Sequence, residues 1–325
     1  MIGELSTSSH LFDVMSTDQG DTTETTGENG VTSASSHRDA MYFEVLVVVI
    51  GVIGTLANGL VLYALMASKQ HKKHELIVNQ NAIDLYSCLA LIIIYGLKLS
   101  NMYLSGSLGY WLCMFVQSGS FLFVGFFASS VNLIFISVER YLKVVHSVWS
   151  KKHLHKWMKY VAIACTWIGG LINEMAMVFQ TSAVIDGVCY GYVMVKDPES
   201  RLALGIWVFL ISYLLVLLMS IFCYGKILTV THRQARVMAG HSDGGSSNAQ
   251  THAKQMQFNV IKTMIFVCAF YAVTWLPEKT FILLTSLDVN LHFVNNVYYM
   301  TVFLGFLYIC TNLMIITDEW CLKSE

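Results

Sequence analysis

Residues 131–145 read Val-Asn-Leu-Ile-Phe-Ile-Ser-Val-Glu-Arg-Tyr-Leu-Lys-Val-Val, an apolar run that ends at Glu139-Arg140-Tyr141 and continues into a basic segment. Six more runs of this length lie along the chain. A helix needs about 20 mostly apolar residues to cross a bilayer. We therefore expect seven crossings, approximately at residues 43–67, 76–98, 110–143, 157–180, 202–230, 258–285 and 293–317.

The composition also indicates a membrane protein. Hydrophobic residues make up 55% of the chain and charged residues only 13%, whereas about a quarter of the residues in a soluble domain are charged. Because lipid offers no hydrogen bonds to the backbone, each open-ended spanning segment must be a helix. The sequence predicts an all-α membrane protein built as a seven-transmembrane helix bundle.

Lysine and arginine in the connecting segments predict the orientation of the bundle. Fifteen of them lie on the side of Arg140 and five on the other side, and positive residues collect on the cytoplasmic side. We expect a multi-pass protein of the plasma membrane with its N-terminus outside. The expected organisation is a disordered extracellular tail at 1–40, a seven-helix domain at 41–318 and a short cytoplasmic tail at 319–325.

Several polar and aromatic residues recur in order along the seven runs. They are Gly54, Asn58 and Val61, then Asp84, then Ser129 and Leu133 before Glu139-Arg140-Tyr141, then Trp167, Tyr224 and Thr274-Trp275-Leu276-Pro277. Together they resemble the rhodopsin-like (class A) G-protein-coupled receptors over roughly residues 42–318. The resemblance implies a receptor that binds an extracellular ligand and promotes nucleotide exchange on a heterotrimeric G protein.

The seventh run departs from the family pattern. The family has Asn-Pro-x-x-Tyr there, whereas this chain has Asn312-Leu313-Met314-Ile315-Ile316. The chain contains only two prolines, Pro198 and Pro277. Since proline kinks a helix by removing one hydrogen bond and clashing with the preceding turn, helix seven is expected to be straighter than in the family.

The resemblance assigns two groups of residues to signalling. Glu139, Arg140 and Tyr141, with Tyr224, would form the G-protein coupling surface, and Arg140 would pair with Glu139 at rest. Trp275 and Pro277 would form the activation switch. The alternatives are that Arg140 only anchors the helix at the cytoplasmic face and that Trp275 only packs beside an ordinary kink.

The resemblance also implies an ion site and a disulfide. Asp84, Ser129 and Asn312 would hold a sodium ion or ordered water in the bundle core, because a hard cation prefers oxygen ligands. A protonated Asp84 in a purely structural polar network is the alternative. Cys113 and Cys189, both on the predicted outer face, would form a disulfide.

Two ligand classes can be excluded on chemistry. Leu122 occupies the place where amine receptors carry an aspartate, and Phe306 the place where opsins carry the lysine that binds retinal. Charged residues inside apolar helices usually face a cavity or each other. We expect a ligand site that is lined by Leu122 and has a charged floor. The floor is formed by Glu174, Glu278 and Lys279. Above the floor lie Gln117, Tyr298 and Tyr299.

A peptide or a polar small molecule fits such a site better than an apolar ligand. The alternative is an internal Glu278–Lys279 ion pair that never touches ligand.

The rival functions are a decoy-like receptor that binds without coupling and, with less support, a transporter or channel. The sequence contains no Gly-x-Ser-x-Gly or His-Glu-x-x-His motif, so no enzyme is expected. The expected partners are the ligand, the G protein and the lipid bilayer, with no nucleic acid.

Overall fold

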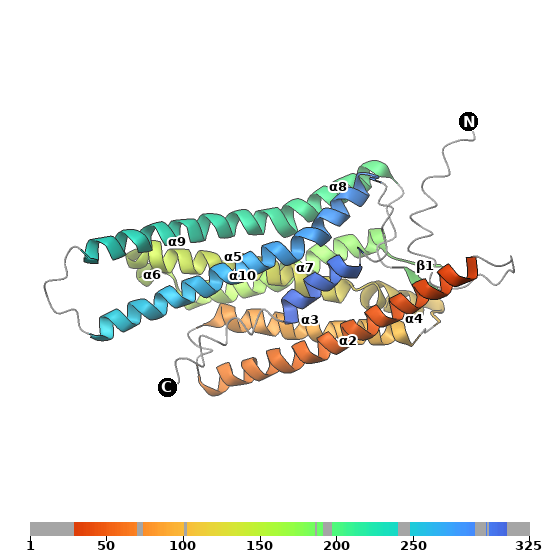
Figure 1. Cartoon of the computed structure of the whole chain (residues 1–325), viewed down its shortest axis with the longest axis horizontal. Coiled ribbons are helices and arrows are strands. Elements are labelled where there is room, and N and C mark those ends of the chain that lie inside the picture. The colour runs from red at the N-terminus through yellow and green to blue at the C-terminus, as the bar shows by residue number, and fades with distance from the viewer. Residues whose placement is uncertain are drawn as a thin grey trace.

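The computed structural model describes residues 29–69, 74–100, 103–185, 187–190, 197–239, 248–289, 297 and 299–310. Its helices run side by side along one long axis, with the β-hairpin and α4 at one end of the bundle and α6 at the other (Figure 1). Within the described residues, six helices are long and apolar enough to cross a membrane, and Tyr299–Cys310 forms a shorter apolar helix. The predicted seven-helix bundle is confirmed.

The membrane-length parts of the six long helices follow the predicted spans closely, while α2, α9 and α10 extend beyond them. In chain order the elements are α2 (Asn29–Ala67), α3 (Glu75–Leu99), α4 (Gly106–Leu112), η2 (Cys113–Gln117), α5 (Ser120–Val145), α6 (Ser147–His153), α7 (Lys156–Thr181), β1 (Ala183–Ile185), β2 (Val188–Tyr190), α8 (Pro198–Phe209), η3 (Leu210–Leu214), α9 (Leu215–Ala239) and α10 (Asn248–Ser286). Helix α2 begins at Asn29, inside the segment 1–40 predicted to be disordered. Its membrane-length part begins at Ala40.

The bundle buries a number of polar side chains within its hydrophobic core and exposes many large apolar ones. Asn58, Asp84 and Asn132 are at most 1% exposed, whereas Leu60 and Tyr63 on α2 are 70% and 75% exposed. A soluble protein rarely exposes large contiguous apolar patches, and lipid is the solvent that suits such side chains. The central helix α5 packs against α3, α7 and α9, so its side chains lie where several helices meet.

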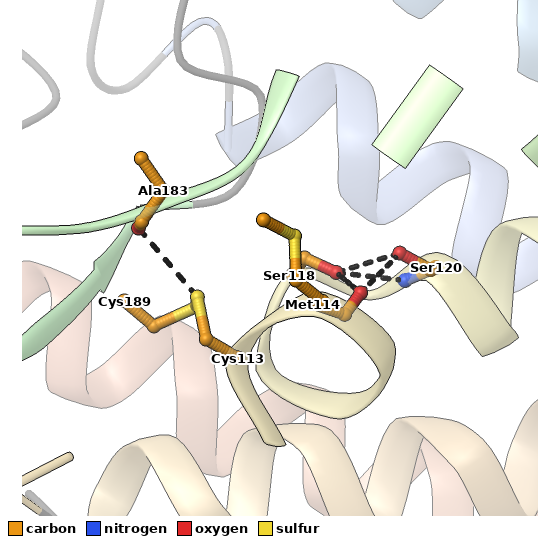
Figure 2. The surroundings of a disulfide bond; sticks show 6 residues. All are labelled: Cys113, Met114, Ser118, Ser120, Ala183 and Cys189. Carbon is orange, nitrogen blue, oxygen red and sulfur yellow. Dashed lines mark hydrogen bonds between the residues drawn. A yellow bond between two sulfur atoms is a disulfide. The ribbon is translucent and has the colours of Figure 1, made fainter. Parts of the chain in front are cut away.

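Helix three is broken near its hairpin end, where a continuous helix over 110–143 was expected. The π-helical segment η2 follows α4, and Gly119 then adopts a left-handed backbone (φ 83°) before α5 starts. The hydroxyls of Ser118 and Ser120 lie 2.6 Å and 2.8 Å from the freed carbonyl oxygen of Met114 (Figure 2). The break lies between Cys113 and the start of α5, the helix that carries Arg140.

Helix five, which comprises α8, η3 and α9, contains a second π-helical segment, η3, although its only proline, Pro198, lies at its first residue. The Tyr213 hydroxyl donates to the carbonyl of Ala272 at 3.0 Å, and the Tyr271 hydroxyl donates to the carbonyl of Ser212. A π-helical turn leaves backbone groups without their usual partner. The two tyrosines therefore tie helix five to α10 just before Pro277.

Candidate functional site

The acid of the Glu139-Arg140 pair has other partners in the structure. Glu139 Oε1 lies 2.7 Å from Lys143 Nζ and 3.5 Å from Lys159 Nζ, and Lys159 also lies 2.5 Å from Glu75 Oε2. The expectation that Arg140 pairs with Glu139 is therefore wrong for this structure. The Nε atom of Arg140 is buried and has no hydrogen-bond partner in the described part of the chain.

His74 lies at the start of α3, close to this charge cluster. Burial, reinforced by the positive charges of Arg140 and Lys143, lowers its pKa from 6.5 to about 4. The imidazole is therefore neutral at physiological pH and adds no further positive charge beside Arg140.

The two tyrosines assigned to coupling lie near Arg140 in different surroundings. The Tyr141 hydroxyl is 3.1 Å from Nε2 of His146, and its ring contacts Phe222 on helix five. Tyr224 is buried and accepts a hydrogen bond from Ser137 at 3.5 Å. Ser137 lies three residues before Arg140 on α5, so Tyr224 sits about one turn further into the bundle.

A chain of hydrogen bonds crosses the middle of the bundle from α7 to α3 and α5. Trp167 Nε1 donates to Asn79 Oδ1 (3.0 Å), and Asn79 Nδ2 donates to Asn132 Oδ1 (3.0 Å). Asn132 Nδ2 donates to Gln80 Oε1 (2.8 Å), and Gln80 Nε2 donates to Asp84 Oδ1 (3.1 Å). We call these five side chains the amide relay.

The amide relay bears on the predicted sodium site. The Gln80 Nε2 group also donates to the Ser129 hydroxyl, which lies 3.4 Å from Asp84 Oδ1. Asp84 and Ser129 are thus brought together as predicted, but an amide nitrogen with its protons lies against both oxygens. This arrangement does not fit a cation bound by those two oxygens. Asn312, the third predicted ligand, lies outside the described residues.

Trp275 occupies the centre of an aromatic cluster two residues before Pro277. Its ring lies 5.1 Å from that of Phe126 on α5 and 6.4 Å from that of Tyr308. Tyr308 belongs to the short apolar helix Tyr299–Cys310, which is helix seven and is called the terminal helix. A Cβ atom added at Gly305 would come within 3.2 Å of the indole, so the glycine lets the terminal helix approach the ring. Trp275 is therefore in contact with helix three and with helix seven at once.

The charged residues after Pro277 pair with each other. Glu278 Oε2 lies 2.9 Å from Lys279 Nζ, and both side chains are buried. Lys279 Nζ also lies 4.9 Å from the centre of the Trp275 ring. The internal ion pair left open as an alternative is thus present, and it adjoins the predicted switch residue.

The remaining predicted ligand residues lie in other local clusters. Glu174 accepts a hydrogen bond from Asn173 (2.9 Å), and Asn173 accepts one from Trp207 (3.1 Å). The ring of Tyr299 packs against Phe43 on α2 at 4.6 Å. Gln117 ends the π-helical segment η2, and Leu122 is buried in the first turn of α5. Tyr298 lies outside the described residues.

The predicted disulfide between Cys113 and Cys189 is confirmed, with Cα atoms 5.3 Å apart. It joins the start of η2 to strand β2, and Val184 pairs with Cys189 across the antiparallel hairpin. Figure 2 shows the strand passing over the helix that carries Cys113. Gly187 in the hairpin turn has φ 80°, and its carbonyl accepts from Leu104 N at 2.8 Å.

Sequence reasoning assigned no role to three residues that the structure places in these sites. Gln80 and Asn132 are polar residues inside apolar runs, and that signal could have placed them in a buried network. Lys159 was counted only among the basic residues that set orientation. Its pairing with Glu75 and Glu139 depends on how three helices pack, which the sequence does not reveal.

The fold and the buried polar groups define the class as a seven-helix membrane protein, because apolar helices enclose polar side chains that connect one helix to the next. The chain belongs to the 7 transmembrane receptor (rhodopsin family), whose family model matches residues 57–315. Members of this class are receptors rather than enzymes.

Three curated relatives share similar levels of identity with the chain. Human galanin receptor type 1 is 25% identical over 72% of this chain and 66% of its own length. Mouse C-C chemokine receptor type 8 is 25% identical over 78% of this chain and 67% of its own. The allatostatin-A receptor of Bombyx mori is 25% identical over 74% and 64%. The chain thus spans about two thirds of the length of these relatives.

Proposed function

We propose that the protein is a plasma-membrane receptor that couples an extracellular ligand to a heterotrimeric G protein. Its N-terminus and the disulfide-bonded hairpin face outward, and Arg140 faces the cytoplasm. Family membership supports the receptor class, and the excess of lysine and arginine on the Arg140 side supports the orientation.

The observation that carries this proposal is the state of Arg140. Its neighbour Glu139 is engaged by Lys143 and Lys159, and Arg140 Nε has no partner among the described residues. A buried guanidinium donor without an acceptor is costly. A partner protein that inserts backbone carbonyls or a carboxylate at this end of the bundle would supply the missing acceptors.

Trp275 offers a physical route from the ligand side to Arg140. It contacts Phe126 on the helix that carries Arg140, and it lies next to Pro277, where α10 lacks one backbone hydrogen bond. A ligand that favours one position of α10 shifts the population of bundle conformations by its difference in affinity. Movement of α10 away from α5 would open the Arg140 end to a partner.

A peptide is the ligand class that the relatives favour. The three relatives are named as receptors for galanin, C-C chemokines and allatostatin-A, all of them polypeptides. The buried pair of Glu278 and Lys279 supports a ligand with charged or strongly polar groups, because a ligand that carries both a cationic and an anionic group can pair with both residues and leave neither buried charge unpaired.

Nucleotide exchange on a panel of purified G proteins tests the proposal. Membranes that contain the receptor should accelerate exchange on at least one G protein, with or without a peptide library, and Arg140→Ala should abolish the effect at equal expression. An epitope inserted between Lys143 and Lys156 should be accessible only after the cells are permeabilised. A receptor that binds peptides but resembles Arg140→Ala throughout the panel would be a non-coupling receptor, and the proposal would fail.

A further inference from the structure

We propose that the Gln80 side-chain amide takes the place of a cation between Asp84 and Ser129, so that the core of this receptor does not respond to sodium. Asp84 is 1% exposed, and a buried carboxylate requires a positive or hydrogen-bonding partner. In this chain the partner is built into the same helix, four residues before Asp84. The inference does not depend on the ligand or on G-protein coupling.

Trp167, at the end of the amide relay farthest from Asp84, fixes the direction of every hydrogen bond in the relay. The Trp167 indole nitrogen can only donate, so Oδ1 of Asn79 must face it and Nδ2 of Asn79 must face Asn132. The Asn132 side chain therefore accepts through Oδ1. Its Nδ2 group is left to face Gln80, and Oε1 of Gln80 accepts from it.

A second anchor fixes the same direction independently. Asn132 Nδ2 also donates to the backbone carbonyl of Leu76 at 3.0 Å, and a carbonyl can only accept. The amide of Asn132 is therefore oriented from both sides. Gln80 must present its nitrogen, not its oxygen, toward Asp84 and Ser129.

The two protons of Gln80 Nε2 are directed at two of the three predicted cation ligands, Asp84 and Ser129. One proton is donated to Asp84 Oδ1 and the other to the Ser129 hydroxyl. A sodium ion needs lone pairs from its ligands, whereas an amide nitrogen offers only protons with partial positive charge. An ion coordinated by these two oxygens would have to displace the Gln80 amide, which is 3% exposed and held at its other end by Asn132.

Thermal unfolding of the purified receptor in lipid nanodiscs tests the proposal with sodium itself as the probe. The midpoint Tm is measured in sodium chloride and in choline chloride at equal ionic strength. We expect the same Tm in both salts for the wild-type receptor. A saturable, sodium-specific rise of Tm that Asp84→Asn removes would overturn the proposal, because ligand that binds only the folded state must raise its stability.

The variant Gln80→Glu supplies the positive test. A glutamate of the same size still accepts from Asn132, but it replaces both protons with oxygen lone pairs and places a second carboxyl group beside Asp84. At about pH 8, where carboxyl groups ionise, we expect a lower Tm in choline that sodium restores in a saturable way. A folded Gln80→Glu receptor with no sodium response would show that the amide is not what excludes the ion.

The variant Trp167→Phe is the matched control. It removes the indole donor at the far end of the amide relay while Leu76 continues to orient Asn132. We expect a lower Tm by the same amount in sodium and in choline. A sodium response in Trp167→Phe would contradict the fixed direction of the Gln80 amide. Should Gln80→Glu fail to fold, the wild-type comparison still decides the question.

Discussion

The ammonium group of Lys279 lies 4.9 Å from the centre of the Trp275 indole ring. The two residues flank Pro277 on α10, and Glu278 holds the same ammonium group at 2.9 Å. A desolvated cation over an indole is worth about 2 kcal/mol. The contact therefore links the charged pair to the aromatic cluster that reaches helix three. A change in the partner or position of Lys279 would act directly on Trp275 in the predicted switch.

Breaking the charged pair from one side is expected to destabilise the receptor. Lys279→Met leaves Glu278 buried without its cation, which should lower the free energy of unfolding by about 3–5 kcal/mol. The double variant Lys279→Met with Glu278→Leu should recover most of that loss, because no charge remains buried. Thermal unfolding measures both.

Once an agonist peptide is known, Glu278→Gln and Lys279→Gln should each change the potency of that peptide at matched surface expression. Unchanged potency in both variants would exclude the pair from the ligand site.

Releasing Glu139 from its lysines should reduce ligand-independent signalling. In Lys143→Gln combined with Lys159→Gln, Glu139 loses both cations and becomes available to Arg140. We expect basal nucleotide exchange to fall on the order of five-fold, the effect of about 1 kcal/mol. The control combines Lys151→Gln and Lys152→Gln, two exposed lysines, and should leave basal exchange unchanged. Equal basal exchange in both double variants would contradict the role given to Glu139.

Gly54 is expected to tolerate no side chain. A Cβ atom there would lie 2.6 Å from Cys88 Sγ and 2.7 Å from Cys310 Sγ, where helices one, two and seven meet. Gly54→Ala should therefore cost about 1–3 kcal/mol of stability, as overpacking usually does. Gly59→Ala on the same helix meets nothing within 4 Å and should leave Tm unchanged or slightly raised. A wild-type Tm in Gly54→Ala would mean that the two thiols move aside at little cost.

Acid should destabilise the receptor through His74. Its pKa is about 4 in the folded protein and 6.5 when unperturbed. As pH falls from about 6.5 toward 4, the unfolded state binds a proton that the folded state does not, so the free energy of unfolding decreases. Above pH 6.5 the histidine contributes no pH dependence. His74→Gln should flatten this part of the Tm–pH profile, whereas an unchanged profile would assign the acid sensitivity to other groups.

Individual residues show how far the sequence could predict the sites. Cys113 and Cys189 could be paired by resemblance because both fall on the same predicted face of the membrane. Asp84 and Ser129 could be placed together in the bundle core because the family resemblance implies a shared ion site. The partner that lies between them could not, since Gln80 differs from an ordinary buried amide only in the direction imposed by Trp167 and Asn132 on other helices. The pairing of Glu139 was mispredicted because the adjacent Arg140 was preferred over Lys143, one helical turn further along α5, and over Lys159 on α7.

The sequence alone determined that apolar helices of this length must cross a bilayer, because the cost of burying an unpaired backbone in lipid leaves no other open-ended structure. It also determined which polar residues lie inside those helices. Tertiary structure alone decided which of these polar groups meet and in which direction each hydrogen bond points. Those choices depend on helix rotation and on local breaks such as the one at Gly119, and a hydrogen bond depends on geometry that hydrophobic patterning does not encode.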